Sequence, residues 1–239
     1  MTSILAIETS TDACSVALHS ASGDAFRYAQ EPRSHTQLVM KMINEVLLEL
    51  SVEVTKLDAL SVSVGPGSFT GLRIGFAAVQ GLAFGLDIPV VPVSSLEVMV
   101  ATYTRTMRAN ALPAKSHGNQ RVMVVLDARM GEFNCGCYDV DFDGQISTCH
   151  DDRLLKAEDA IKWLQELSPS AIIGDGDKLL SSGGEWSELL THVYPNAVDL
   201  LGIALPKYNK GEGKAISAID LVYLRGTEAW QKRKRIREA

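Results

Sequence analysis

The stretch SILAIETSTDACSVALH, residues 3–19, decides how the chain begins to fold. Its first seven residues are mostly apolar and include one charge, Glu8, near their end, which is typical of a buried strand. In the segment Cys14–His19 apolar and polar residues then alternate, which predicts a second strand. A Gly-centred turn leads into a third strand that ends near Tyr28, so the chain opens with a three-stranded meander.

The segments that follow complete one α/β unit. Ser34 and Gln37 have the spacing of a capping box, which predicts a helix over 34–50. That helix carries a single apolar stripe, so we expect it to pack one face on the sheet. The elements expected next are a strand at 58–65, a helix from 68 to about 85, a strand at 89–93 and an amphipathic segment at 94–106.

The same order recurs, in weaker form, after a polar stretch at 108–121 that we interpret as a linker or a long surface loop. A strand at 121–127 again ends in an acid, Asp127, at the position equivalent to Glu8. The duplication predicts two α/β lobes with a cleft between them, covering 1–106 and 107–239. The other elements expected are a strand at 133–140, a helix at 156–167, a strand at 171–174 and a helix around 177–190.

The composition is that of an ordinary folded protein. Hydrophobic residues make up 46% and charged residues 22% of the 239 positions, which excludes collagen-like, low-complexity and largely disordered chains. The net charge of −6 argues against a generally basic nucleic-acid surface. Without a basic leader, a disulfide pattern or a long enough uncharged run, we expect a cytoplasmic protein with reduced thiols and no membrane span.

The glycine-rich segment GPGSFTGLRIG, residues 65–75, invites comparison with phosphate-binding loops. It lacks the Lys of GxxxxGK[ST], and Thr70 stands where GxGxxG requires its last glycine. A tight turn followed by close helix packing is therefore the favoured interpretation.

The helix that follows this turn is unusual because it has four interior glycines and one charge. Each glycine costs about 1 kcal/mol relative to alanine in a helix interior, so burial on more than one side is expected to offset this. One side is the sheet, and we predict that the other is a subunit interface shared with the preceding helix, with internal packing alone as the alternative. The predicted interface residues are Leu38, Met42, Val46, Gly71, Arg73, Gly75, Ala78, Gly81, Leu82 and Gly85.

Three further patterns have ordinary explanations. DVDFDG at 139–144 begins like a calcium loop but places His150 where a bidentate Glu is needed, so a hairpin is the better interpretation. Cys135 and Cys137 share a strand face near Cys149, yet no metal-binding spacing accompanies them, and we expect core thiols. His35 is expected at the surface.

The end of the chain is basic. From Arg225 onward the sequence has six Lys and Arg residues and two acidic residues, Glu228 and Glu238, which gives a net charge of +4. Such a run suits the end of a solvated helix. Contact with RNA phosphates is the alternative.

Several motifs together resemble the bacterial TsaB (YeaZ) family over nearly the whole chain. GPGSFTGLRIG followed by LAFGLDIPVVPVSSLE is the most specific part. Lys41 departs from the family pattern, where Pro is expected. The other matching segments are ILAIETSTDACSVAL (4–18), SHTQL (34–38), LDARMGEFNCGCY (126–138), IIGDGD (172–177) and VYLR (222–225).

The resemblance implies an actin-like, ribonuclease H-like fold, with a mixed five-stranded sheet flanked by helices in each lobe. It implies a role in making N6-threonylcarbamoyladenosine at position 37 of tRNAs that read codons beginning with A. TsaD is the transferase there, TsaB its non-catalytic partner and TsaE an ATPase that docks on the pair. TsaB proteins also self-associate through helices of the first lobe. No cofactor of this chain's own is implied, although ATP or ADP has room at the joint with TsaD, and tRNA would be reached indirectly or through the basic end.

Residue types support a non-catalytic subunit. TsaD-like chains carry two metal-binding histidines four residues apart, and here those positions are Ser95 and Met99, which are poor ligands for such a metal. We therefore expect no metal site and no metallopeptidase activity, since no HExxH motif is present either.

The enzyme alternative is an ATPase or small-molecule kinase of the same fold. It would place Glu8 or Asp12 together with Asp127 around magnesium. A degenerate nucleotide cleft is therefore predicted at Glu8, Ser10, Asp12, Asp127, Arg129, Gly174 and Gly176.

Overall fold

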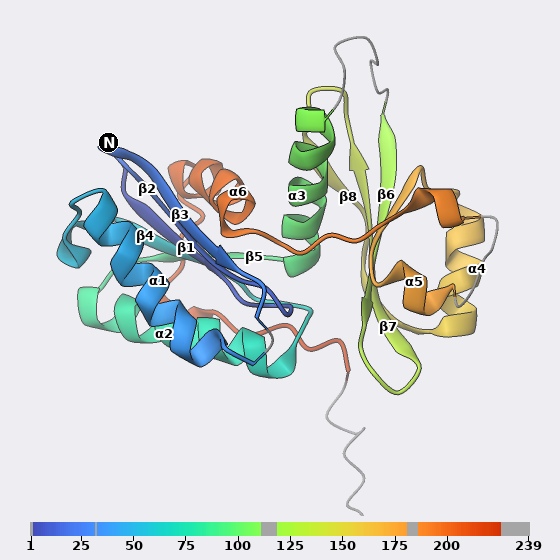
Figure 1. Ribbon diagram of the computed structural model, residues 1–239, viewed down its shortest axis with the longest axis horizontal. Helices are drawn as coiled ribbons and strands as arrows, with labels where there is room; N and C mark the ends of the chain where they lie inside the picture. Colours follow the sequence, from blue (N-terminus) through green and yellow to red (C-terminus); the bar gives the residue numbers. More distant parts are fainter. Residues whose placement is uncertain (1, 32, 111–118, 181–185, 226–239) are drawn as a thin grey trace, which may run out of the picture.

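The computed structural model describes residues 2–31, 33–110, 119–180 and 186–225, which form two α/β lobes side by side (Figure 1). The first sheet has the strand order β3-β2-β1-β4-β5. Its central strand, β1, pairs antiparallel with β2 and parallel with β4, so the sheet is mixed. The strands are β1 (Ile4–Glu8), β2 (Cys14–Ser20), β3 (Gly23–Ala29), β4 (Ala59–Ser63) and β5 (Val90–Val93).

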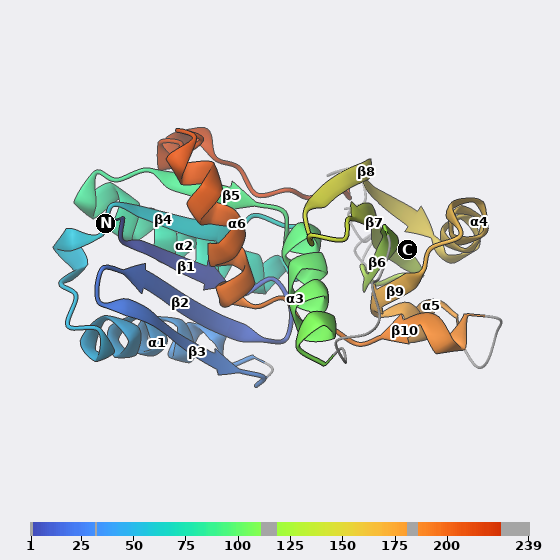
Figure 2. The same cartoon turned by 90° about the horizontal axis from the view of Figure 1, so that it is seen from above.

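Helices cover both faces of the first sheet because its central strand is apolar on both sides. Leu5 and Ile7 belong to the core beneath α1 and α2, whereas Ile4 and Ala6 belong to the core beneath α6. Side chains of a strand alternate between the two faces, which is why an unbroken apolar run is needed here. Figure 2 shows the sheet between these helices. The helices are α1 (His35–Glu49), α2 (Phe69–Leu86) and α6 (Ala197–Asn209).

The second sheet repeats this plan with the order β10-β9-β6-β7-β8. Val122 and Val124 of its central strand pack against α3, and Met123 and Val125 pack against α4. Its strands are β6 (Gln120–Asp127), β7 (Glu132–Val140), β8 (Ile146–Lys156), β9 (Ala171–Gly174) and β10 (Leu190–Thr191), and its helices are α3 (Ser95–Asn110), α4 (Ala157–Leu167) and α5 (Gly176–Leu179).

The two sheets share one topology. In each, the central strand pairs antiparallel with the next strand of the chain and parallel with a later strand that follows a helix. The predicted duplication into two mixed five-stranded sheets is thereby confirmed, with Glu8 and Asp127 at equivalent strand ends.

Some local predictions are wrong. The helix expected around 177–190 is observed only as the short α5; residues 181–185 lie outside the described residues, and a 3-10 turn (Ser187–Leu189) and β10 follow them. The capping box is also absent, since the Ser34 hydroxyl donates to the Glu31 carbonyl instead. The helix α6 and the strand β10 have no counterpart among the predicted elements, whereas β8 is the third strand that the repeated order and the hairpin at 139–144 imply.

Two helices pack on the lobe opposite to the one that their place in the sequence predicts. By sequence α6 falls within 107–239, yet it packs on β1 and β2 of the first sheet. Residues 214–222 follow it there, and Lys214 forms a bridge with Val90. In turn α3, which begins before residue 106, fills the core of the second lobe. The expected basic C-terminal helix lies outside the described residues.

By length and composition alone, α2 is apolar enough to cross a membrane. Its packing is that of a helix in an α/β lobe, because Leu72, Val79 and Ala83 are buried against the first sheet. The opposite side of α2 is exposed and largely apolar, with Arg73 as its only charge.

Candidate functional site

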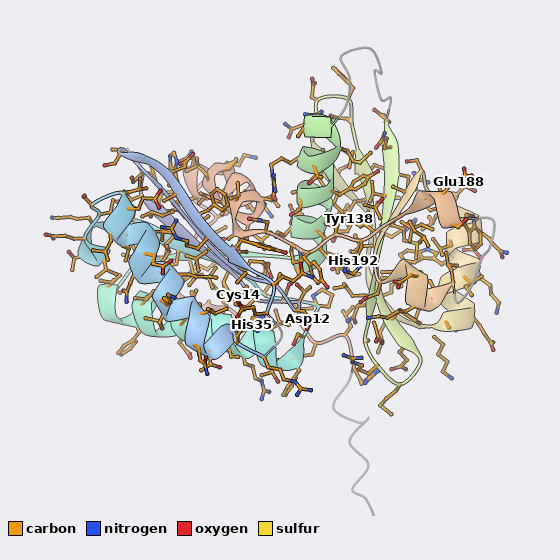
Figure 3. All side chains as sticks on the ribbon, in the orientation of Figure 1. Asp12, Cys14, His35, Tyr138, Glu188 and His192 are labelled. Carbon is orange, nitrogen blue, oxygen red and sulfur yellow. The ribbon has the colours of Figure 1, made fainter. Side chains whose placement is uncertain are left out.

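A cleft of about 920 Å³ lies between the two lobes. The loop after β1 and the start of α2 form its first-lobe wall, and the ends of β6 and β9 contribute to the second-lobe wall. Figure 3 labels Asp12 and His192, which reach this cleft from the first and the second lobe. Of the predicted cleft residues, those that line it are Ser10, Asp12, Asp127, Arg129 and Gly174.

Glu8 lies behind the cleft wall. Its carboxyl group is fully buried and accepts hydrogen bonds from the Ser10 amide at 2.6 Å and from the Ser63 hydroxyl. Burial raises the pKa of Glu8, which favours the neutral form. Glu8 thus joins β1 to β4 and to the loop after β1, and it is not exposed to a cation in the cleft. Gly176 is also buried.

Two acids at the second-lobe wall, Asp127 and Asp175, already have cationic partners. The Lys178 ammonium lies 2.7 Å from Asp175 and 3.9 Å from Asp127. Arg129 pairs with Asp127 at 3.2 Å, and the Asp127 amide donates to Asp175 at 2.9 Å. Lys178 and Arg129 thus neutralise these two carboxylates, which therefore do not require a bound cation to balance their charge.

The structure adds one group that the sequence did not reveal. Ligand atoms of Asp175, Asp177 and His192 lie within 4.8 Å of one another. The two acids belong to the IIGDGD motif, but only the fold brings His192 beside them. Because Lys178 already holds Asp175, a divalent cation would have to compete with it.

The glycine-rich segment packs against the chain rather than forming an open cradle. The Ser68 amide donates to the Ser10 carbonyl at 2.7 Å, and a Cβ on Gly67 would collide with that carbonyl. A Cβ on Gly71 would collide with the Thr9 carbonyl, and one on Gly75 would collide with the Thr9 hydroxyl. Close helix packing, the favoured interpretation, accounts for these glycines.

His35 is buried, contrary to the prediction of a surface residue. Its Nε2 lies 2.9 Å from the Thr11 carbonyl and 3.2 Å from the Ala13 carbonyl, so the first residue of α1 holds the loop after β1 (Figure 3). The physical reason for this burial is that His35 supplies a donor to the Thr11 and Ala13 carbonyls, which would otherwise lack a partner. Both α1 and α2 therefore contact the loop that carries Asp12.

Ser95 and Met99 have structural roles. The Gly65 amide donates to the Ser95 hydroxyl at 3.1 Å, which ties the start of α3 to the turn before α2. Met99 is fully buried in the core beneath α3. Neither side chain is presented to the cleft.

A second concave surface lies between α1 and α2, with a volume of about 550 Å³. We call it the α1–α2 groove. Met40 and Phe69 are both about half exposed at its margin, at 46% and 50%. The groove is lined by Thr36, Val39, Met40, Phe69, Thr70, Arg73, Ile74, Ala77 and Ala78.

The structure separates the predicted interface residues into two groups. Arg73, Gly81 and Gly85 are exposed, and Leu38, Ala78 and Leu82 are half-buried. Buried residues cannot reach a partner, so the inclusion of Met42, Val46, Gly71 and Gly75 is wrong: Met42 and Val46 face the sheet, and the two glycines face Thr9.

The remaining sequence candidates have local roles. Cys135 and Cys137 are buried, and burial raises the pKa of Cys135 to about 12, as expected of a core thiol. DVDFDG forms the hairpin turn between β7 and β8, where the Gly144 amide donates to the Asp141 carbonyl at 3.0 Å.

The duplicated sheets and the cleft between them define an actin-like, two-lobed α/β protein. Residues 29–169 match the family described as TsaD: tRNA N6-adenosine threonylcarbamoyltransferase. The chain is 35% identical over 234 residues to the tRNA threonylcarbamoyladenosine biosynthesis protein TsaB of Escherichia coli (strain K12), covering 96% of this chain and 97% of that one. It therefore belongs to the TsaB (YeaZ) family.

Two further relatives agree with this assignment. The TsaB protein of Haemophilus influenzae is 31% identical over 237 residues, which cover 96% of either chain. The structure of YeaZ from Pseudomonas aeruginosa superposes with a TM-score of 0.78 at 33% identity, over 94% of this chain and 100% of that one.

Proposed function

We propose that this chain is the non-catalytic subunit that binds and activates a TsaD-like transferase in the formation of N6-threonylcarbamoyladenosine at position 37 of tRNAs reading codons that begin with A. The names of its full-length relatives support the pathway. The observation that carries the subunit role is the α1–α2 groove with the exposed side of α2 beside it.

The exposed side of α2 has the properties of a docking surface. Its Gly81 and Gly85 have nothing within 4 Å of the position of a Cβ, and Phe84 is 84% exposed. The bare backbone at the two glycines allows another helix to approach closely, and the exposed Phe84 ring offers it an apolar contact. Only 28% of the 18 residues of α2 are buried, which is consistent with a partner that covers its exposed side.

Three features favour an activator over a catalyst. At the two ligand positions, Ser95 binds a backbone amide and Met99 lies in the core, so neither side chain is free to hold a metal. Glu8 is buried, and Asp127 pairs with Arg129. An activator of this kind acts by binding one conformation of its partner better than the others.

The same surface serves both assemblies in this proposal. Alone, the chain forms a homodimer through α1 and α2, and the transferase replaces the second copy. A TsaE-like ATPase docks on the resulting pair, and ATP or ADP binds at the joint with the transferase. The complex is cytoplasmic, and tRNA is held by the transferase or by the basic end of the chain.

Two glycine substitutions test the docking surface. Gly81 of α2 and Gly202 of α6 are both exposed helical glycines with nothing near the Cβ position. Gly81→Leu should abolish both the homodimer and the complex with the transferase in light scattering, while Gly202→Leu should leave them intact. Equal binding by the two variants would overturn the proposed surface, since neither change has a reason to unfold the chain.

A further inference from the structure

The last described segment, residues 214–225, runs along the first lobe, and we call it the strap. Its start adds a bridge to the edge of β5, where Lys214 and Val90 exchange backbone hydrogen bonds of 2.8 and 2.9 Å. Ile219 is buried in the core beneath α2. The Val222 amide then donates to the Val64 carbonyl at 2.7 Å. The strap is therefore a fixed part of the first lobe as far as Val222.

The end of the strap contacts the start of α2. The rings of Tyr223 and Phe69 lie 5.4 Å apart, and Arg73 Nε donates to the Tyr223 hydroxyl at 3.1 Å. Gly65 permits the chain to pass, because a Cβ there would lie 2.6 Å from the Val222 carbonyl oxygen. Val222 to Arg225 also line the cleft, so the strap forms part of its wall.

Arg225 then crosses to the second lobe. Its Nε donates to Glu132 at 3.0 Å, and its Nη2 donates to the same carboxylate at 2.5 Å and to the Arg129 carbonyl at 3.0 Å. The Arg225 and Glu132 side chains are only 28% and 29% exposed. Such a partly buried contact, with two donors on one carboxylate, is stronger than an isolated surface ion pair.

The turn that receives Arg225 has an unfavourable backbone. Arg129, Met130 and Gly131 all have positive φ values, of 69°, 60° and 75°. Residues other than glycine are disfavoured in this region. A guanidinium that binds the Arg129 carbonyl and the Glu132 side chain stabilises this turn from the opposite lobe.

We propose that the end of the strap is a latch, in which Arg225 fastens the first lobe to the turn at 129–131 and holds the cleft closed. Release of Arg225 frees the second lobe to rotate away and opens the cleft on the side of Tyr223. The latch is a property of the chain alone and does not depend on the proposed role in tRNA modification.

Hydrogen exchange measured by mass spectrometry tests the contact. Arg225→Gln and Glu132→Gln should each raise by about tenfold the exchange of the Ala128 amide, which donates to the Glu132 carbonyl across the turn at 129–131, and the double variant should add nothing further. The matched control is Arg121→Gln, which breaks an ion pair with Asp139 inside the second lobe. Exchange that stays at the wild-type level in both single variants would overturn the latch.

A distance measurement tests the opening. Spin labels at the exposed Thr55 and Glu158, one on each lobe, should give a narrow distance distribution in the protein with Cys149→Ser. Arg225→Gln should broaden or lengthen that distribution, whereas Arg121→Gln should not. The same distribution in Arg225→Gln as in the parent protein would show that Arg225 does not hold the lobes together.

Discussion

The Thr9 hydroxyl donates to the Gly71 carbonyl at 2.8 Å, which fastens the loop after β1 directly onto α2. The contact is close because Gly71 has no Cβ, and any Cβ there would collide with the Thr9 carbonyl. The four glycines of α2 therefore have two different roles. Gly71 and Gly75 admit the chain's own loop, and Gly81 and Gly85 leave the outer side of the helix bare.

Alanine substitutions should separate these two roles. Gly85→Ala should raise the free energy of unfolding by up to about 1 kcal/mol, because alanine is the better helix former and the site is open. Gly71→Ala should lower it by about 1–3 kcal/mol, since the new methyl group overpacks against backbone. Urea denaturation checks both values, and stabilisation by Gly71→Ala would contradict the packing described.

Glu8 should make stability depend on pH. Because its folded pKa is raised by burial, its contribution to stability is full below the unfolded pKa and is lost as pH rises through the folded pKa. Glu8→Gln removes the ionisation while keeping an acceptor for the Ser10 amide. The stability of this variant relative to wild type should therefore increase as pH rises from the ordinary glutamate pKa of about 4.3 toward neutrality. Urea titrations across this range check it, and a constant difference would contradict it.

His35 should hold the loop that carries Asp12. His35→Ala removes the donor to the Thr11 and Ala13 carbonyls and should cost about 1–3 kcal/mol of unfolding free energy. Amide exchange should rise in residues 9–13. His19→Ala, which removes an exposed pair with Asp24, is the control and should change both quantities far less. Similar effects of the two substitutions would show that His35 has no special role.

The first lobe was predictable where periodicity was strong. The run at 4–8 and the stripe on α1 determine the layers, because both patterns are set by burial. The same stripe misled the interface prediction, since Met42 and Val46 were assigned to a partner although they face the sheet. Sequence spacing says which residues share a face, but not which of two apolar faces is covered within the chain.

The second lobe was harder to predict. β8 is an edge strand with the mostly exposed sequence STCHDDR, so burial imposes no alternation on it. The return of α6 to the first sheet depends on contacts between segments about 180 residues apart, such as the Ala197 amide on the Ser15 hydroxyl at 2.9 Å. The contact between Arg225 and Glu132 is equally nonlocal, and the VYLR motif alone gave no sign of it.

The most direct test of the central claim is reconstituted tRNA modification with the purified TsaD-like transferase of the same organism. Wild-type chain and Gly202→Leu should both restore formation of threonylcarbamoyladenosine, Gly81→Leu should not, and the chain alone should produce none. Full modification with Gly81→Leu, or modification by the transferase that is unchanged when this chain is left out, would contradict the account.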